Sequence, residues 1–192
     1  MINIAIFASG SGSNAENIAE YFSGNKEIQI SLILSNKADA FVHERAKKWG
    51  IPSLTCPKKE FDEGKRILEI LRDHNIGFIV LAGFLLKIPD TLIETFPKKM
   101  INIHPALLPK YGGKGMYGDH VHKAVVAAGE TESGITIHYV NEHYDEGQVI
   151  FQAKCEVLPT DTFEDVARKV HKLEYLHFPK VIEQTIGAAQ KR

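Results

Sequence analysis

The chain has 192 residues, of which 44% are hydrophobic and 24% are charged, as in ordinary globular domains. No apolar run approaches the roughly 20 residues of a membrane-spanning helix, and no basic leader precedes the first hydrophobic segment, so neither a membrane span nor a signal peptide is expected. The formal net charge of −1 lacks the basic excess by which nucleic-acid binders neutralise phosphates, so nucleic acid is not an expected partner.

Short β-branched segments alternate with helical patterns over the first half of the chain. The predicted strands are Ile2–Ala8, Ile28–Leu34, Ser53–Cys56, Phe78–Ala82 and Met100–His104. The predicted helices between them lie at 18–22, Ala38–Trp49, Phe61–Leu71 and Pro89–Phe96. Regular alternation of this kind predicts a doubly wound parallel sheet with right-handed crossovers.

The pattern changes in the C-terminal part of the chain. Gly134–Asn141 and Gln148–Val157 are predicted strands, joined by too few residues for a crossover helix, so they should pair antiparallel. Phe163–Phe178 carries apolar residues at helical spacing and is predicted to be a closing helix. Residues 1–192 are therefore predicted to form a single α/β domain with a mostly parallel, mixed, Rossmann-like sheet, which binds ligands beyond the carboxyl ends of its strands.

A loop rich in glycine and serine, Ala8-Ser-Gly-Ser-Gly-Ser-Asn14, follows the first predicted strand. Gly10 and Gly12 permit unusual backbone conformations, and free amides at the next helix start can face an anion. Ser13 and Asn14 add side-chain donors and are expected to cap that helix. The loop also fits the G-x-G-x-x-A dinucleotide pattern, but the second predicted strand ends without a carboxylate for a ribose hydroxyl. A monophosphate site is favoured over NAD(P), with a plain turn as the alternative.

Asn102 and His104 lie two residues apart near the end of a predicted strand, so both should face the same side. Pro105 cannot donate in a sheet and is expected to end the strand. This pattern predicts either a reaction centre at the carboxyl edge of the sheet or two residues that only cap a strand end. Asp145 lies in the turn between the antiparallel strands, where position alone favours a solvent-exposed aspartate.

Four histidines, His120, His122, His138 and His143, raise the question of a metal site. His120 and His122 are two apart at a predicted helix start and would not share a face. No cysteine or glutamate completes a zinc-binding pattern, so no metal is expected. His138 lies in a predicted strand and either lines the site near His104 or packs as an ordinary core histidine.

Five segments together resemble the phosphoribosylglycinamide formyltransferase family, folate-dependent enzymes of de novo purine synthesis. These segments are Ser9-Gly-Ser-Gly-Ser-Asn14, Leu34-Ser-Asn-Lys-Ala-Asp39, Leu81-Ala-Gly-Phe84, Asn102-Ile-His-Pro-Ala-Leu-Leu-Pro109 and Asp145-Glu-Gly147. The resemblance covers essentially the whole chain. The fourth segment is typical of the wider formyltransferase superfamily, and the first narrows it to the glycinamide branch or the formylfolate hydrolases.

The resemblance implies a transfer of formyl from 10-formyltetrahydrofolate, without a metal, to the amine of phosphoribosylglycinamide. It implies Asn102, His104 and Asp145 as catalytic residues. Asn102 and protonated His104 are then expected to donate to the developing oxyanion, and Asp145 to raise the pKa of His104 above about 6.5. The implied substrate-binding residues are Gly12, Ser13, Asn14 and Glu174, and the implied folate-binding residues are Leu85, Leu86, Lys87, Ile88 and Asn102. The proton leaving the amine could pass through His104, Asp145 or a water.

The resemblance is weaker at two places. The family often has a basic residue where this chain has Leu86, and Lys87 is expected to substitute for it. A family arginine falls close to Gly64-Lys65-Arg66, without a clear match. In addition, the glycine-rich loop 110–119 is either a flap that closes over folate or an ordinary surface loop.

Three other functions compete with this interpretation. Formyltetrahydrofolate hydrolases share the reaction centre but generally carry a further N-terminal domain. Methionyl-tRNA formyltransferases need a tRNA-binding domain and a basic surface. A phosphate-binding module would leave the predicted reaction centre without a purpose. Cys56 and Cys155 form no C-x-x-C pair and are expected to be reduced thiols of a cytoplasmic protein, a monomer or homodimer with small-molecule substrates.

Overall fold

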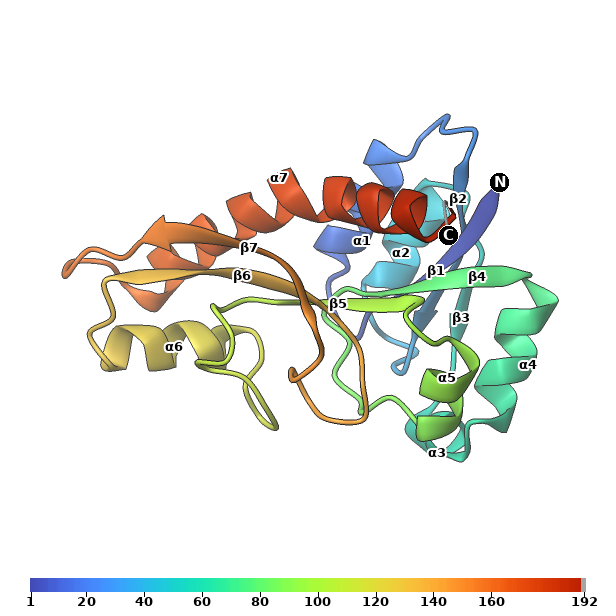
Figure 1. Ribbon diagram of the computed structural model, residues 1–192, viewed down its shortest axis with the longest axis horizontal. Coiled ribbons are helices and arrows are strands. Elements are labelled where there is room, and N and C mark those ends of the chain that lie inside the picture. The colour runs from blue at the N-terminus through green and yellow to red at the C-terminus, as the bar shows by residue number, and fades with distance from the viewer. Residues whose placement is uncertain (191–192) are drawn as a thin grey trace.

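In the computed structural model, which describes residues 1–190, seven strands form one mixed sheet covered by helices (Figure 1). The strands are β1 (Ile2–Phe7), β2 (Ile28–Ser35), β3 (Ser53–Thr55), β4 (Ile76–Leu81), β5 (Met100–His104), β6 (Glu132–Tyr139) and β7 (Val149–Glu156). The helices are α1 (Ser13–Tyr21), α2 (Val42–Lys48), α3 (Lys58–Glu63), α4 (Lys65–Asp73), α5 (Asp90–Thr95), α6 (Asp119–Ala127) and α7 (Phe163–Gln190). Over these 190 residues, no helix has the length and apolar character required to cross a bilayer.

The sheet has the strand order β3-β2-β1-β4-β5-β6-β7. Strands β1 to β5 pair in parallel, whereas β6 pairs antiparallel with both β5 and β7. The prediction of a doubly wound, mostly parallel mixed sheet is confirmed. Chain order reverses at β1, which lies between β2 and β4, and ligands of α/β sheets bind beside such a switch point.

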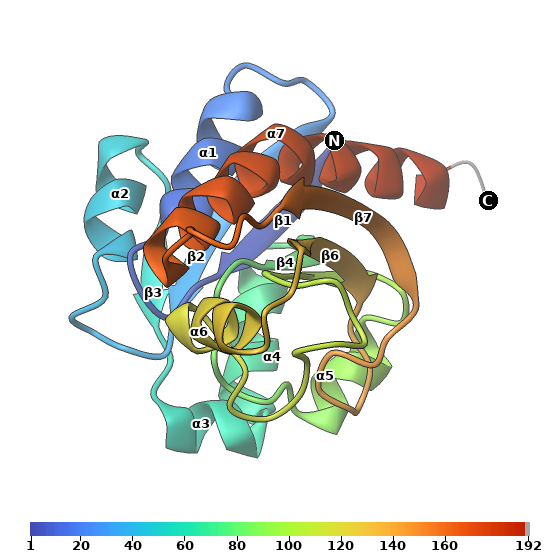
Figure 2. The ribbon, with the colours of Figure 1, turned by 90° about the vertical axis from the view of Figure 1, so that its left-hand side faces the viewer.

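The parallel strands are buried on both faces. On β1, Ile4 and Ile6 belong to one hydrophobic cluster and Ala5 and Phe7 to the other, and all four are fully buried. Helices α1, α2, α6 and α7 contribute to the first cluster, and α3, α4 and α5 to the second. Figure 2 shows α1 and α7 on the opposite side of the sheet from α4 and α5. Two-sided burial explains the continuous apolar runs of these strands.

Helix α1 begins at Ser13, before the predicted 18–22, and α2 begins at Val42 instead of the predicted Ala38. Two other predicted helices differ in number or length. The single helix predicted over 61–71 is interrupted at Gly64, where φ of +73° gives the left-handed conformation that ends α3. The closing helix predicted to end at Phe178 continues through Pro179 to the end of the described chain. It continues because residues beyond the proline, such as Ile182, are fully buried in the core.

Candidate active site

Strand β5 carries Asn102 and His104 to the carboxyl edge of the sheet. In the antiparallel pairing with β6, Asn102 lies opposite His138 and His104 lies opposite Thr136. His104 is only 4% exposed, so its ring is shielded from water. Both side chains face the turn that follows β6, as their spacing in a strand requires.

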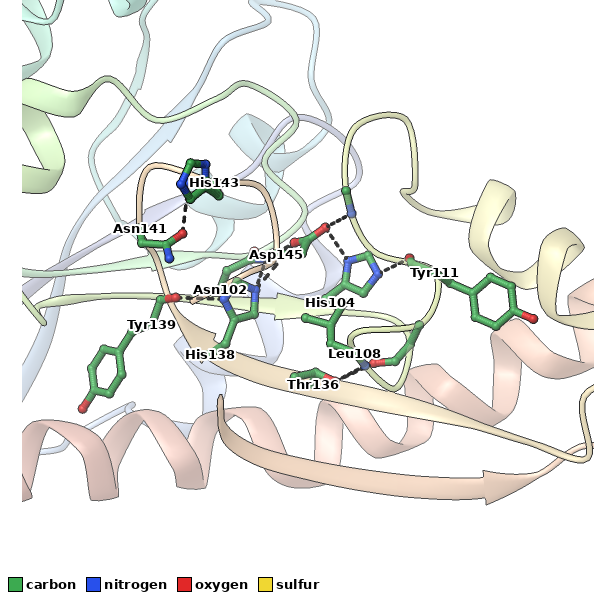
Figure 3. A network of polar contacts seen from close by, with 12 residues as sticks. Asn102, His104, Leu108, Tyr111, Thr136, His138, Tyr139, Asn141, His143 and Asp145 are labelled. Atoms are coloured by element: carbon green, nitrogen blue, oxygen red, sulfur yellow. Dashed lines mark hydrogen bonds and ion pairs between the residues drawn. The ribbon is translucent and has the colours of Figure 1, made fainter. Parts of the chain in front are cut away.

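Asp145 lies in the turn between β6 and β7 and points back toward β5 (Figure 3). Its Oδ2 atom lies 3.5 Å from His104 Nδ1, and its Oδ1 atom lies 3.5 Å from Asn102 Nδ2. The Asp145 side chain is 11% exposed. The alternative of a solvent-exposed turn aspartate is therefore wrong, and the three residues form one group.

His138 belongs to the same group. Its Nδ1 atom donates to the carbonyl of Tyr139 at 2.8 Å, and its Nε2 atom accepts from Asn102 Nδ2 at 3.1 Å. This pattern of one donating and one accepting nitrogen is that of a neutral imidazole. Of the two roles considered for His138, the structure supports the one in which it lines the site.

Both ring nitrogens of His104 face oxygen atoms. Nε2 donates to the backbone carbonyl of Tyr111 at 2.7 Å, and Nδ1 faces Asp145. Burial lowers the pKa of His104 below its ordinary value, and the Asp145 carboxylate and the Tyr111 carbonyl offset this effect only in part. The prediction of a raised pKa and a protonated His104 is wrong, because desolvation of the buried ring dominates. We assign the single proton of the neutral ring to Nε2, which leaves the Nδ1 lone pair toward Asp145.

Asp145 is the charged member of the group. Burial raises the pKa of Asp145, but His138, His104 and a 2.9 Å hydrogen bond from the Gly113 amide outweigh this and hold the pKa below its ordinary value. A carboxylate thus lies beside the free nitrogen of a neutral imidazole. A proton that arrives at His104 Nδ1 would form a cation next to this carboxylate, so the arrangement suits proton uptake.

The glycine-rich loop after β5 contacts this group directly. The backbone amide of Gly113 donates to Asp145, and the backbone carbonyl of Tyr111 accepts from His104. Neither contact could be predicted from residue types, because backbone atoms supply both. Residues 111–113 are therefore part of the site, and closure of the loop as a flap stays a prediction.

The loop after β1 leads directly into α1. Gly12 has φ of +71° and precedes the first helical residue, and its carbonyl accepts from the amide of Glu16 at 2.9 Å. Ser13 and Asn14 form the first turn, where free amides can face an anion. The prediction that they cap α1 is wrong: no side-chain cap is found at this end of the described helix, and Asn14 Nδ2 instead donates to Glu174 Oε2 at 3.0 Å.

Glu174 is a buried carboxylate on α7, 5% exposed. Its Oε2 atom accepts from Asn14 and from His171 Nδ1, the latter at 2.8 Å. Within residues 1–190, Asn14 Oδ1 and His122 Nδ1 are buried without a hydrogen-bond partner. Such atoms are rare in folded proteins, and a polar ligand would satisfy them.

A pocket adjoins Asn102. Leu86, Lys87 and Ile88 of the predicted folate-binding stretch line it together with Asn102. Leu85 is not among the described residues that line this pocket: the residue is 39% exposed, and its backbone amide donates to Ser9 Oγ at 2.9 Å. The turn that carries Asp145 adds lining residues that the sequence did not reveal, namely Val140, Asn141, His143 and Tyr144.

The chain is similar to known proteins over nearly its full length. The formyl transferase family model matches residues 2–182. The phosphoribosylglycinamide formyltransferase of Bacillus subtilis is 38% identical over 192 residues, which cover 97% of this chain and 96% of that protein. The chloroplastic phosphoribosylglycinamide formyltransferase of Arabidopsis thaliana is 42% identical over 93% of this chain, which spans only 63% of that longer protein.

A solved structure gives the same result. The phosphoribosylglycinamide formyltransferase from Streptococcus pneumoniae superposes with a TM-score of 0.86 at 35% identity, over 97% of this chain and 99% of that one. Sequence and fold therefore agree over nearly the full length of two bacterial proteins. Together with the family match, these similarities show that the chain belongs to the phosphoribosylglycinamide formyltransferases of the formyl transferase family.

Proposed function

We propose that this chain transfers the formyl group of 10-formyltetrahydrofolate to the amine of 5-phosphoribosylglycinamide, a step of de novo purine biosynthesis. The observation that carries the proposal is the contact of Asp145 with both His104 and Asn102 at the carboxyl edge of the sheet. A plain phosphate-binding module has no need of a buried carboxylate beside a neutral imidazole.

Asn102 is proposed to stabilise the oxyanion. When the amine attacks the formyl carbon, negative charge develops on the formyl oxygen. One Asn102 N–H already donates to His138, and the other faces Asp145 at 3.5 Å, the outer limit of a hydrogen bond. That second N–H has only this weak contact to exchange for a hydrogen bond to the oxyanion, and such donors are worth about 10²–10³ in rate.

His104 is proposed to accept the proton of the attacking amine at Nδ1. The new carbon–nitrogen bond leaves the amine nitrogen with an extra proton, and the folate nitrogen needs one when its bond to the formyl carbon breaks. His104 can take the first proton and return it for the second, while Asp145 stabilises the transient imidazolium 3.5 Å away. The protonated His104 expected from the sequence is thus an intermediate of the cycle rather than its starting state.

The substrates are proposed to bind on either side of this centre. The phosphate would face the amides of Gly12, Ser13 and Asn14, and the glycinamide part would contact Glu174, which the buried unpartnered oxygen of Asn14 supports. The folate would enter the pocket beside Asn102. Its lining residues from the predicted stretch are Leu86, Lys87 and Ile88.

One assay tests the proposed function. The protein is incubated with 10-formyltetrahydrofolate, with and without phosphoribosylglycinamide, and loss of the formyl group is followed. We expect consumption only when the acceptor is present. Consumption without the acceptor would indicate a hydrolase, and no consumption in either sample would indicate a binding module.

The neutral form of His104 should persist to a lower pH than that of a free histidine, because burial lowers its pKa. A nitrogen NMR titration of the free protein from about pH 5 to 8 should therefore show the His104 ring taking up a proton only below about pH 6.5. The protein is titrated alone, because the amine of the acceptor itself takes up a proton near about pH 8 and would add its own limb to kcat/KM. A His104 midpoint well above pH 6.5 would mean that the pKa is raised and would contradict the assignment.

Gly12→Ala should weaken both the fold and the binding of phosphoribosylglycinamide. An added Cβ would lie 2.4 Å from Val42 Cγ2, at a backbone φ of +71° that disfavours alanine. We expect a loss of about 1–3 kcal/mol in the free energy of unfolding. We also expect a KM for this substrate about tenfold higher, equivalent to ~1.4 kcal/mol. Gly50→Ala is the control, since Gly50 has φ of +64° but no heavy atom within 4 Å of a Cβ.

The remaining proposals concern the context in which the chain works. We propose one formyltransferase domain over residues 1–192, of which the last two lie outside the described residues. We also propose a cytoplasmic monomer or homodimer that acts on small molecules and needs no metal. The free thiols Cys56 and Cys155 support a reducing compartment. Light scattering after size exclusion decides the oligomeric state.

A further inference from the structure

Tyr111 has an unusual backbone conformation for an aromatic residue. Its φ is +57°, in the left-handed region that bulky side chains disfavour. Glycine adopts this region without strain, and Gly112 and Gly113 follow directly. A tyrosine keeps such a conformation only where its surroundings impose it, and strained residues of this kind are concentrated at functional sites.

The consequence of this conformation is the direction of the Tyr111 carbonyl. The carbonyl oxygen lies 2.7 Å from His104 Nε2, whereas the ring points away from the reaction centre (Figure 3). Tyr111 packs instead against the larger hydrophobic cluster, and it lines a pocket together with Val125 of α6. Side chain and backbone of one residue thus have separate roles.

The Tyr111 hydroxyl is held by a carboxylate. It donates to Glu130 Oε1 at 2.9 Å, in the segment between α6 and β6. Lys110 donates to both oxygens of the same carboxylate, at 2.9 and 3.1 Å. Glu130 therefore connects two successive loop residues to the start of β6.

The chain just before Tyr111 is held by a second set of contacts. The buried hydroxyl of Thr136 donates to the carbonyl of Ala106 at 2.7 Å and accepts from the amide of Leu108 at 3.0 Å. Gln152 of β7 donates to the same hydroxyl at 2.9 Å. Residues 106–108 are thus supported from β6 and β7, whereas Lys110 and Tyr111 are held by Glu130.

We propose that Tyr111 is a positioning residue of the formyl transfer, which keeps the proton of His104 on Nε2, and that Glu130 keeps Tyr111 in place. The inference rests on the proposed function. A carbonyl can only accept, so Nε2 must carry the proton as long as this hydrogen bond exists. Without the carbonyl, the Asp145 carboxylate would draw the proton to Nδ1, and that nitrogen could no longer accept one from the amine.

Tyr111→Phe is the sharpest test, because it removes only the hydroxyl that Glu130 holds. We expect kcat to fall about tenfold, since small displacements in a reaction centre reduce rates by such factors, with both KM values and the melting temperature nearly unchanged. Nitrogen NMR of His104 should show a shift of the neutral ring toward the Nδ1-protonated tautomer. Glu130→Ala should reproduce both effects, and the double variant should add nothing to either single change.

Two further variants separate positioning from general damage. Glu130→Gln keeps an oxygen that accepts from the Tyr111 hydroxyl, so it should retain most of kcat. Tyr21→Phe removes a hydroxyl that donates to Glu183 at 2.8 Å, a matched pair between α1 and α7, and should change neither kcat nor the His104 signals.

The outcomes are distinct. An unchanged tautomer in Tyr111→Phe overturns the inference, whatever happens to kcat, and so does a changed tautomer with wild-type kcat. If the unaltered chain transfers no formyl group, the proposed function fails instead. The tautomer measurement then still decides whether Tyr111 orients His104, because it needs no substrate.

Discussion

Asp145→Asn should lower kcat by about 10²–10⁴, the range associated with general acid–base catalysis. The amide has the shape of the carboxylate but removes the negative charge that stabilises an imidazolium at His104. In addition, its nitrogen can turn toward His104 Nδ1, 3.5 Å from the present Oδ2, and donate to the lone pair that should accept the proton of the amine. Single-turnover formyl transfer at saturating substrates measures the effect.

A matched control exists outside the reaction centre at Asp161, whose side chain is 10% exposed. Asp161 also has a pKa below its ordinary value, because Lys169 and the Leu158 amide donate to it, but it lies on the loop between β7 and α7. Asp161→Asn should leave kcat unchanged. Turnover close to that of the wild type in Asp145→Asn would remove Asp145 from the mechanism.

His104→Ala should reduce kcat by a similar factor of about 10²–10⁴ while both substrates still bind. Binding should persist because the proposed phosphate contacts lie at the start of α1, with Ser13, and the proposed folate contacts include Ile88. Calorimetry with each substrate and single-turnover kinetics separate the two effects. The double variant with Asp145→Asn should be no slower than the worse single variant, since both residues serve one proton transfer.

The control for this change is His74→Ala. His74 follows α4 at the amino ends of the strands, the edge opposite the site, and its Nδ1 bonds to the Ile70 carbonyl at 2.9 Å. Its loss should leave kcat intact. If His104→Ala retained wild-type turnover, the proton would have to leave the amine by another route. That result would contradict the proposed role of His104 as the proton acceptor.

The parallel half of the sheet could be predicted from the sequence because its signals are local. Strands such as 78–82 are apolar throughout and are bounded by polar turns, so each can be recognised by itself. The alternation of such strands with helical patterns then indicates parallel strands joined by crossover helices. The interruption at Gly64 could not be foreseen, because a glycine within an amphipathic pattern is compatible with one helix or two. Pro179 wrongly indicated the end of the closing helix. The helix continues because the burial of residues beyond the proline outweighs its local preference for a helix end.

The clustering of Asn102, His104 and Asp145 could be predicted from the sequence, but the protonation of His104 could not. Spacing placed Asn102 with His104, and family resemblance brought in Asp145 from the distant turn. The sign of the pKa shift of His104 depends on whether burial outweighs a carboxylate, and that balance needs the three-dimensional environment. The contacts of Tyr111 and Gly113 with the site could not be predicted from the sequence either, because main-chain atoms make them.

The hydrogen bond between Asn14 and Glu174 joins positions 160 residues apart. During synthesis on a ribosome, Asn14 is made 160 residues before its partner on α7. A nascent chain that has already assembled β1 to β5 therefore still lacks the carboxylate that pairs with the Asn14 amide. The proposed contacts with the glycinamide substrate should consequently form only when α7 docks, and not when the central strands are complete.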